Sequence, residues 1–288
     1  MLNSVLVRAT GYHLARPITD RAWKLPPIRN GRMLTAPVFI FSAPRSGSTL
    51  LRAILGSHSE LFAPPELPLK QLEVRAETKW IQASMDGLEL TIEDLEHMLW
   101  DRLLAETLQR SGKPALVVKT PSNVLIWERI AACWPDARFV CLLRHPASVV
   151  ASLHSSFNPA WHPGQEGSVD EAVAKVIRYT TAVEEARQSR GGFTVRYEEL
   201  TASPETVVRD LCGFLGVPFE PAMLDYGRFD HAGFTAGLGD TSLNIRSGRI
   251  QPPAPLPGQM PAGLAEICAA WGYPHPDNEN ENEPSPVS

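Results

Sequence analysis

The loop between residues 42 and 49 carries the side chains of this chain best suited to binding an anion. Its polar and flexible positions are Arg45, Ser46, Gly47, Ser48 and Thr49. The arginine supplies a permanently charged, planar fork, and the three hydroxyl groups add further donors. An apolar run at 38–41 precedes the loop, and a helix-like apolar pattern begins at Leu50. Backbone N–H groups at a helix start favour an anion, so the loop predicts a phosphate-binding site.

This loop differs from the P-loop of nucleoside-triphosphate-binding proteins at one position. In those proteins a lysine follows the glycine and contacts the β- and γ-phosphates, while a hydroxyl binds Mg²⁺. Here Ser48 follows Gly47, so the lysine is missing. The loop therefore favours a single anionic group, such as a monophosphate or a phosphosulfate, over a metal-bound triphosphate. On the loop alone, an ordinary hydroxyl-rich turn between a strand and a helix is the alternative.

A second candidate anion site lies about a hundred residues further along the chain. Arg144 ends a predicted strand, and Ser152 lies eight residues later, two turns into the next predicted helix. This spacing would let a guanidinium and a hydroxyl reach a second phosphate. An ion pair for Arg144 and a purely structural role for Ser152 explain the spacing at least as well.

Strands that alternate with helices are expected to position these groups. Short apolar runs predict strands at 38–41, 115–119, 137–143 and 193–197, with helices between them. Such alternation predicts a P-loop-containing, three-layer α/β/α fold with a mostly parallel central sheet. Because ligands bind beyond the carboxyl ends of parallel strands, the 42–49 loop, Lys119, Arg144 and Tyr197 are expected to converge.

Local signals fix where several helices begin. Residues 91–94 form a capping-box pattern for a helix that reaches about Gln109. Ser168 is expected to cap another helix, and Pro146 suits a first helical turn. The proline-rich residues 63–68 are expected to form a loop.

Composition restricts the class of protein. The chain has 288 residues with a net charge of −5 and no basic run, which gives no reason to expect a nucleic-acid partner. No apolar stretch approaches the roughly eighteen residues that a membrane span needs, and the first thirty-five residues do not resemble a secretory signal. No cluster of His, Cys and carboxylate residues has metal-ligand spacing, so we expect no metal. The cysteines lack CxxC spacing and predict buried free thiols in a cytoplasmic protein: Cys133, Cys141, Cys212 and Cys268.

Three motifs together resemble the sulfotransferases that use 3′-phosphoadenosine 5′-phosphosulfate (PAPS). Residues 44–50 resemble the 5′-phosphosulfate loop of this family, and residues 144–146 with Ser152 resemble its 3′-phosphate element. Residues 195–200 resemble its tyrosine-acidic-leucine segment, whose aromatic side chain, here Tyr197, lies by the adenine. The order and the spacing of the motifs agree from about residue 37 to residue 250.

The resemblance is nearest to the branch that holds tyrosylprotein sulfotransferases and sulfotransferases of bacterial natural-product pathways. It implies that Glu66, twenty-one residues after Arg45, is the base and that Lys119 lies near the transferring group. Cytosolic aryl and steroid sulfotransferases instead use a histidine two positions after that lysine, where this chain has Pro121. The resemblance also implies that an arginine of residues 246–249 touches the 3′-phosphate. We expect Arg246 to make this contact, Arg249 is the alternative that the sequence leaves open, and a surface ion pair would explain Arg246 equally well.

The resemblance implies transfer of a sulfonate group from PAPS, without a metal, to a hydroxyl of a small-molecule or glycan acceptor. Glu66 would be the general base, and Lys119 and Arg45 would stabilise the leaving phosphate. A P-loop kinase using Mg-ATP and a non-catalytic nucleotide-binding protein are the alternatives. We expect an N-terminal arm at 1–36, a sulfotransferase domain at 37–274 and a disordered tail at 275–288.

Overall fold

A five-stranded sheet forms the centre of the part of the protein that the structure describes. The computed structural model describes residues 31–157, 167–229, 231, 243–258 and 260–273. The strand order is β2-β3-β1-β4-β5, and each neighbouring pair is parallel. The strands are β1 (Val38–Phe41), β2 (Leu61–Phe62), β3 (Ala115–Lys119), β4 (Arg138–Leu143) and β5 (Phe193–Arg196). The predicted parallel α/β sheet is confirmed.

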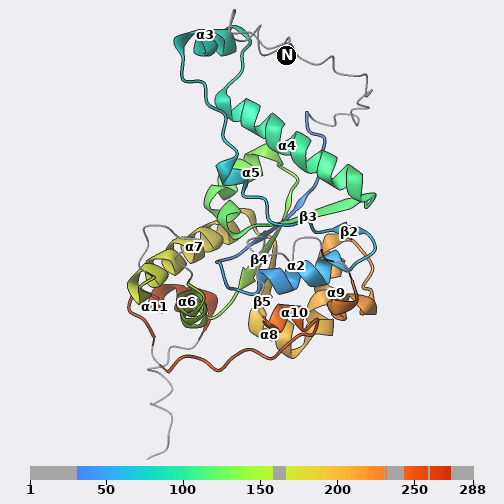
Figure 1. Ribbon diagram of the computed structural model, residues 1–288, viewed down its shortest axis with the longest axis vertical. Coiled ribbons are helices and arrows are strands. Elements are labelled where there is room, and N and C mark those ends of the chain that lie inside the picture. The colour runs from blue at the N-terminus through green and yellow to red at the C-terminus, as the bar shows by residue number, and fades with distance from the viewer. Residues whose placement is uncertain (1–30, 158–166, 230, 232–242, 259, 274–288) are drawn as a thin grey trace, which may run out of the picture.

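Helices cover both faces of this sheet (Figure 1). The α-helices are α2 (Ser48–Gly56), α3 (Lys79–Gly87), α4 (Ile92–Ser111), α5 (Trp127–Cys133), α6 (Pro146–Ser155), α7 (Val169–Arg190), α8 (Tyr197–Ala202), α9 (Pro204–Leu215), α10 (Leu243–Arg246) and α11 (Ala265–Trp271). The short 3₁₀ segments are η1 (Leu69–Gln71), η2 (Pro121–Ile126), η4 (Pro221–Leu224) and η5 (Tyr226–Arg228).

The alternation of side chains along β1 explains the three layers. Phe39 and Phe41 point into a core shared with α4, α5 and α7, whereas Val38 and Ile40 point into a core shared with α2 and α9. Since both faces of the strand are buried, its sequence is continuously apolar rather than alternating. The predicted three-layer α/β/α arrangement is confirmed.

The predicted helix starts at three positions are also confirmed. Thr91 and Asp94 form the reciprocal capping box of α4, which ends at Ser111, two residues beyond the predicted end. The Ser168 side chain accepts a hydrogen bond from the backbone N–H of Glu171 at the start of α7. Pro146 occupies the first turn of α6.

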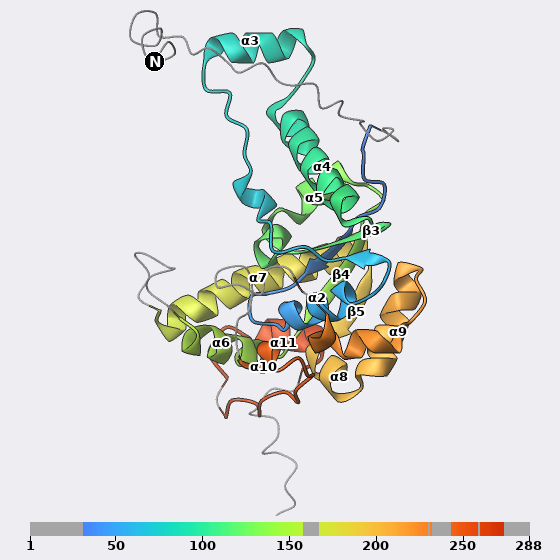
Figure 2. The same cartoon turned by 45° about the vertical axis from the view of Figure 1, so that its right-hand side comes forward.

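Two elements, β2 and α3, were not predicted from the sequence, and one boundary differs from the prediction. β2 has only two residues, too few for a periodic pattern. α3 lies far from the sheet, beyond the start of α4 (Figure 2), and buries only one of its side chains, Met85. Tyr197 does not end the fourth predicted strand, because it begins α8. Glu198 and Glu199 lie in the first turn of that helix, where negative charge favours helix formation.

The ends of the chain fall largely outside the described residues, as do most of the predicted arm and the predicted tail. Of the arm, residues 31–36 are described, and Leu34 is buried in the core. The backbone N–H groups of Met33 and Leu34 both donate to the carboxylate of Asp101 on α4. This end of the arm therefore packs with the domain, and the described fold begins before residue 37.

The predicted free, buried state of all four cysteines is confirmed. Burial raises the pKa of the Cys133 and Cys141 thiols to about 12, so neither ionises at neutral pH. Among the described residues no helix is both long and apolar enough to cross a membrane.

Candidate functional site

The loop after β1 has a backbone shape suited to an anion. Arg45 and Gly47 both have left-handed backbone angles, with φ of 67° and 91°. Ser48 and Thr49 then open α2, whose first backbone N–H groups have no intrahelical carbonyl to bond. Successive N–H groups in such a turn form a concave anion-binding surface. A positive φ at a non-glycine residue is strained and is typical of functional sites.

Tyr197 packs directly against this loop. A Cβ atom placed on Gly47 would lie 2.3 Å from Cδ2 of the tyrosine ring. No side chain fits there without moving the ring or the backbone, so Gly47 is required both by its positive φ and by the contact.

We expect Gly47→Ala to lower the free energy of unfolding by about 1–3 kcal/mol, because alanine is disfavoured at positive φ and its methyl group clashes with Tyr197. Urea denaturation measures this change. Gly87→Ala is the matched control, since a Cβ there meets no atom within 4 Å. Equal stability of both variants with wild type would contradict the tight contact.

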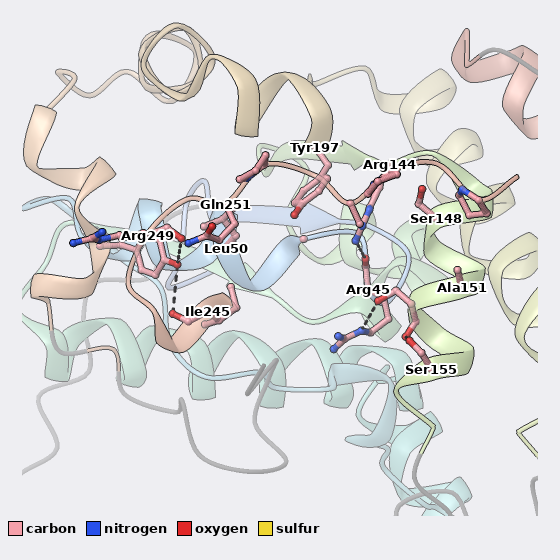
Figure 3. A pocket seen from close by; sticks show the side chains of 17 residues that line it. Arg45, Leu50, Arg144, Ser148, Ala151, Ser155, Tyr197, Ile245, Arg249 and Gln251 are labelled. Atoms are coloured by element: carbon pink, nitrogen blue, oxygen red, sulfur yellow. Dashed lines mark hydrogen bonds between the residues drawn. The ribbon is translucent and has the colours of Figure 1, made fainter. Parts of the chain in front are cut away.

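A cavity of about 480 Å³ lies between this loop, α6, Tyr197 and the segment 249–257 (Figure 3). Nη1 of Arg144 donates to the backbone carbonyl of Arg45 at 2.8 Å, and its guanidinium lies 4.4 Å from the centre of the Tyr197 ring. Nε of Arg45 donates to the hydroxyl of Ser152 at 3.3 Å. The cavity therefore brings together five residues that the sequence placed in a nucleotide site: Arg45, Gly47, Arg144, Ser152 and Tyr197.

Glu198 fixes the relative positions of the β4 and β5 ends. Its carboxylate accepts hydrogen bonds from the backbone N–H of His145 at 3.0 Å and from the hydroxyl of Tyr273 at 2.7 Å. Burial and the nearby carboxylate raise the pKa of Tyr273, so its hydroxyl stays protonated and donates. Arg144 precedes His145 in the chain, and Tyr197 precedes Glu198. The bond between His145 and Glu198 therefore holds Arg144 and Tyr197 side by side.

A smaller cavity of about 220 Å³ adjoins the other side of the loop. Lys119 and Glu66 form an ion pair at its wall, and Nζ of Lys119 also donates to Oγ1 of Thr49 at 3.3 Å. The lysine side chain is buried, whereas a quarter of the Glu66 side chain is exposed. Four residues line both cavities, which places the cavities next to each other: Arg45, Gly47, Leu50 and Ile245.

Two predicted residues lie outside both cavities. Ser46, although part of the loop, is buried, and Arg246 is exposed at the end of α10. Arg249, three residues later, lines the larger cavity instead. The turn around Gly248, with a φ of 68°, separates the two arginines. Of these two arginines, only Arg249 lines the larger cavity.

The charges of the site suit a ligand with two anionic groups. Arg45, Arg144 and Lys119 supply cations around the two cavities, and Glu66 supplies one partly exposed carboxylate. Within the described residues no group of three or more His, Cys, Asp or Glu side chains could hold a metal ion. The arrangement can bind a dianionic nucleotide and accept a proton beside one of its anionic ends.

Comparison with known proteins identifies the family. Residues 37–221 match the family described as "Sulfotransferase family". The protein-tyrosine sulfotransferase 1 of Danio rerio is 25% identical over an alignment of 296 residues, gaps included. The alignment covers 90% of this chain and 81% of that protein. A protein of Aquifex aeolicus is 29% identical over 230 residues, which are 75% of this chain but only 30% of that relative.

Solved structures agree with the sequence match. The sulfotransferase domain from the curacin biosynthetic pathway superposes with a TM-score of 0.61 at 26% identity, covering 84% of this chain and 99% of that domain. A second domain, from the Synechococcus PCC 7002 olefin synthase, has the same fold, with a TM-score of 0.60 at 24% identity over 87% of this chain and 99% of that one. The chain therefore belongs to the sulfotransferase family.

Proposed function

We propose that this protein transfers a sulfonate group from PAPS to a hydroxyl of a small-molecule or glycan acceptor. The observation that carries the proposal is the Glu66–Lys119 pair at the wall of the smaller cavity, next to the larger one. The pair supplies a base and a cation beside the loop that is shaped for an anion. No metal ligand set accompanies them among the described residues.

The larger cavity suits the nucleotide part of the donor. Arg144 and Ser152 would hold the 3′-phosphate, and Tyr197 would lie by the adenine. Arg45 and the start of α2 would hold the 5′-phosphosulfate, which would then face the smaller cavity. This support is geometric, because residues from the ends of four strands, β1, β3, β4 and β5, line the two adjoining cavities.

The reaction requires a proton acceptor near the attacking oxygen and a cation near the leaving phosphate oxygen. The acceptor oxygen attacks sulfur, the bond from sulfur to the phosphate oxygen breaks, and the acceptor proton passes to Glu66. The phosphate oxygen of the product gains negative charge, which Lys119 and Arg45 stabilise. A bound phosphosulfate competes with Glu66 for the ammonium of Lys119, which leaves the carboxylate to face the acceptor.

Calorimetry with 3′-phosphoadenosine 5′-phosphate (PAP), the product, tests donor binding. We expect PAP to bind in buffer without divalent cations and Mg-ATP to bind far more weakly. Incubation with labelled PAPS and a panel containing phenols, a tyrosine peptide and saccharides then tests transfer. Tight Mg-ATP binding without PAP binding would indicate a kinase, and PAP binding without consumption of PAPS would indicate a non-catalytic protein.

We expect Arg249→Ala to weaken PAP binding by about tenfold or more, because a charged hydrogen bond to a phosphate contributes about 1.5–3 kcal/mol. Arg246→Ala is the matched control, since this exposed side chain lines neither cavity. Calorimetry with PAP measures both variants. The opposite order of effects would assign the 3′-phosphate contact to Arg246.

A further inference from the structure

The loop that carries Glu66 is held from two sides by buried polar side chains. We call residues 63–68 the Glu66 loop. Its prolines have no backbone N–H to donate, and none of its residues belongs to a helix or a strand. A carboxylate on such a loop keeps a fixed position only if other groups bind the loop backbone.

Arg52 binds the loop from the side of α2. Its Nη1 donates to the carbonyl of Ala63 at 3.2 Å and to the carbonyl of Pro64 at 3.4 Å. The side chain is almost fully buried, at 1% exposure, which is unusual for a charged group and has a cost. Burial lowers the pKa of Arg52, and the negative charge of Glu66 opposes that shift. The guanidinium thus interacts with both the loop backbone and its carboxylate.

Thr120 and Asn123 bind the loop from the side of β3. The Thr120 hydroxyl accepts from the N–H of Leu67 at 2.8 Å and donates to the carbonyl of the same residue at 3.1 Å. The Asn123 amide donates to that carbonyl at 3.2 Å and accepts from the N–H of Leu69 at 2.9 Å. Both side chains are buried.

These contacts connect Glu66 to the two elements that hold the donor site. α2 carries Arg52 and also begins with the anion-binding N–H groups, while Thr120 directly follows Lys119. We propose that Arg52, Thr120 and Asn123 are positioning residues, a polar clamp that sets Glu66 against Lys119 and the 5′-phosphosulfate. The clamp rests on the proposed function of Glu66 as the base.

Thr120→Val tests the clamp, because valine keeps the shape and removes both hydrogen bonds to Leu67. A misplacement of about 1 Å can cost about 100-fold in rate, and we expect a loss of that order in PAPS consumption. Hydrolysis provides a rate without a known acceptor: water attacks sulfur, its proton passes to Glu66, and sulfate and PAP leave. PAP affinity should stay within about twofold of wild type, since Thr120 lines neither cavity.

Three further measurements separate positioning from a general structural role. Thr120→Ser keeps the hydroxyl and should restore most of the rate. Arg52→Lys, at the contact from α2, should lower the rate while PAP binding is retained, because the shorter lysine side chain cannot place its nitrogen where Nη1 of Arg52 bonds both carbonyls. Thr107→Val, which removes a hydroxyl that bonds within α4, is the matched control and should turn over like wild type.

Amide hydrogen exchange reports the clamp independently of catalysis. The Leu67 amide should exchange at least about tenfold faster in Thr120→Val, whereas the Leu51 amide, bonded to the carbonyl of Gly47 at the start of α2, should not change. An unchanged Leu67 amide, or a Thr120→Val enzyme with wild-type turnover, would overturn the clamp. A wild-type protein that neither binds PAP nor consumes PAPS would instead overturn the proposed function. Hydrogen exchange at Leu67 would still show in that case whether Thr120 binds the Glu66 loop.

Discussion

Glu66→Gln is expected to lower sulfonate transfer by about 10²–10⁴-fold, the usual contribution of a positioned general base. Glutamine keeps the size of the side chain and its ability to contact Lys119, but it cannot take the proton of the acceptor. PAP affinity should be unchanged, because Glu66 lines the smaller cavity and not the larger one. Parallel measurement of turnover with labelled PAPS and of PAP binding by calorimetry checks both parts.

Glu73→Gln is the control for this variant. Glu73 lies seven residues further along, is exposed, and lines neither cavity, so the same chemical change there should leave turnover intact. Normal turnover of Glu66→Gln would remove Glu66 from the role of base, and loss of PAP binding would show that its effect is structural.

Lys119→Met is expected to lower turnover by about 10²–10³-fold, because a buried cation beside the leaving group stabilises charge that develops only in the transition state. PAP binding should weaken by a smaller factor, about tenfold, the value of one charged hydrogen bond of about 1.5 kcal/mol. Methionine has a similar shape, so the cavity wall should persist. Kinetics at saturating PAPS and calorimetry with PAP provide the two numbers.

The stability of Lys119→Met separates a catalytic from a structural role. Removing one member of a fully buried ion pair is strongly destabilising, but a quarter of Glu66 is exposed and can be hydrated when the lysine is gone. We therefore expect the free energy of unfolding to change by only about 1 kcal/mol. Lys70→Met, at a lysine that lines neither cavity, should behave like wild type in both assays. A large loss of stability with a proportionate loss of activity would show that the role of Lys119 is structural rather than catalytic.

Predictions from the sequence succeeded where the signal was local. Apolar runs located four of the five strands, and the capping pattern at Thr91 located the start of α4, because short-range sterics and backbone hydrogen bonds determine both. α8 was missed because one turn of helix has almost no periodicity, and the motif that begins at Tyr197 was interpreted as the end of a strand.

The contacts between residues far apart in the sequence could not be predicted from local patterns. Arg52 is a lone charge in the apolar stretch 50–55, and this exception was the only available signal of its contact with the Glu66 loop. Thr120 and Asn123 follow a strand end, as many site residues do, but their partners lie more than fifty residues earlier. Which of Arg246 and Arg249 lines the larger cavity depended on a turn whose direction the local sequence did not specify.

The sequence by itself determined the parallel α/β sheet and the residues from which an anion site could be built, since residue type and spacing decide which chemistry is possible. Only the tertiary structure decided that the 42–49 loop joins two cavities, that Lys119 pairs with Glu66, and that the Glu66 loop is bound from two sides. The physical reason is that strand order and side-chain packing, which are set by the whole core, bring these distant segments within hydrogen-bonding distance. The 42–49 loop is a local property of the chain, whereas the placement of Glu66 beside Lys119 is a property of the fold.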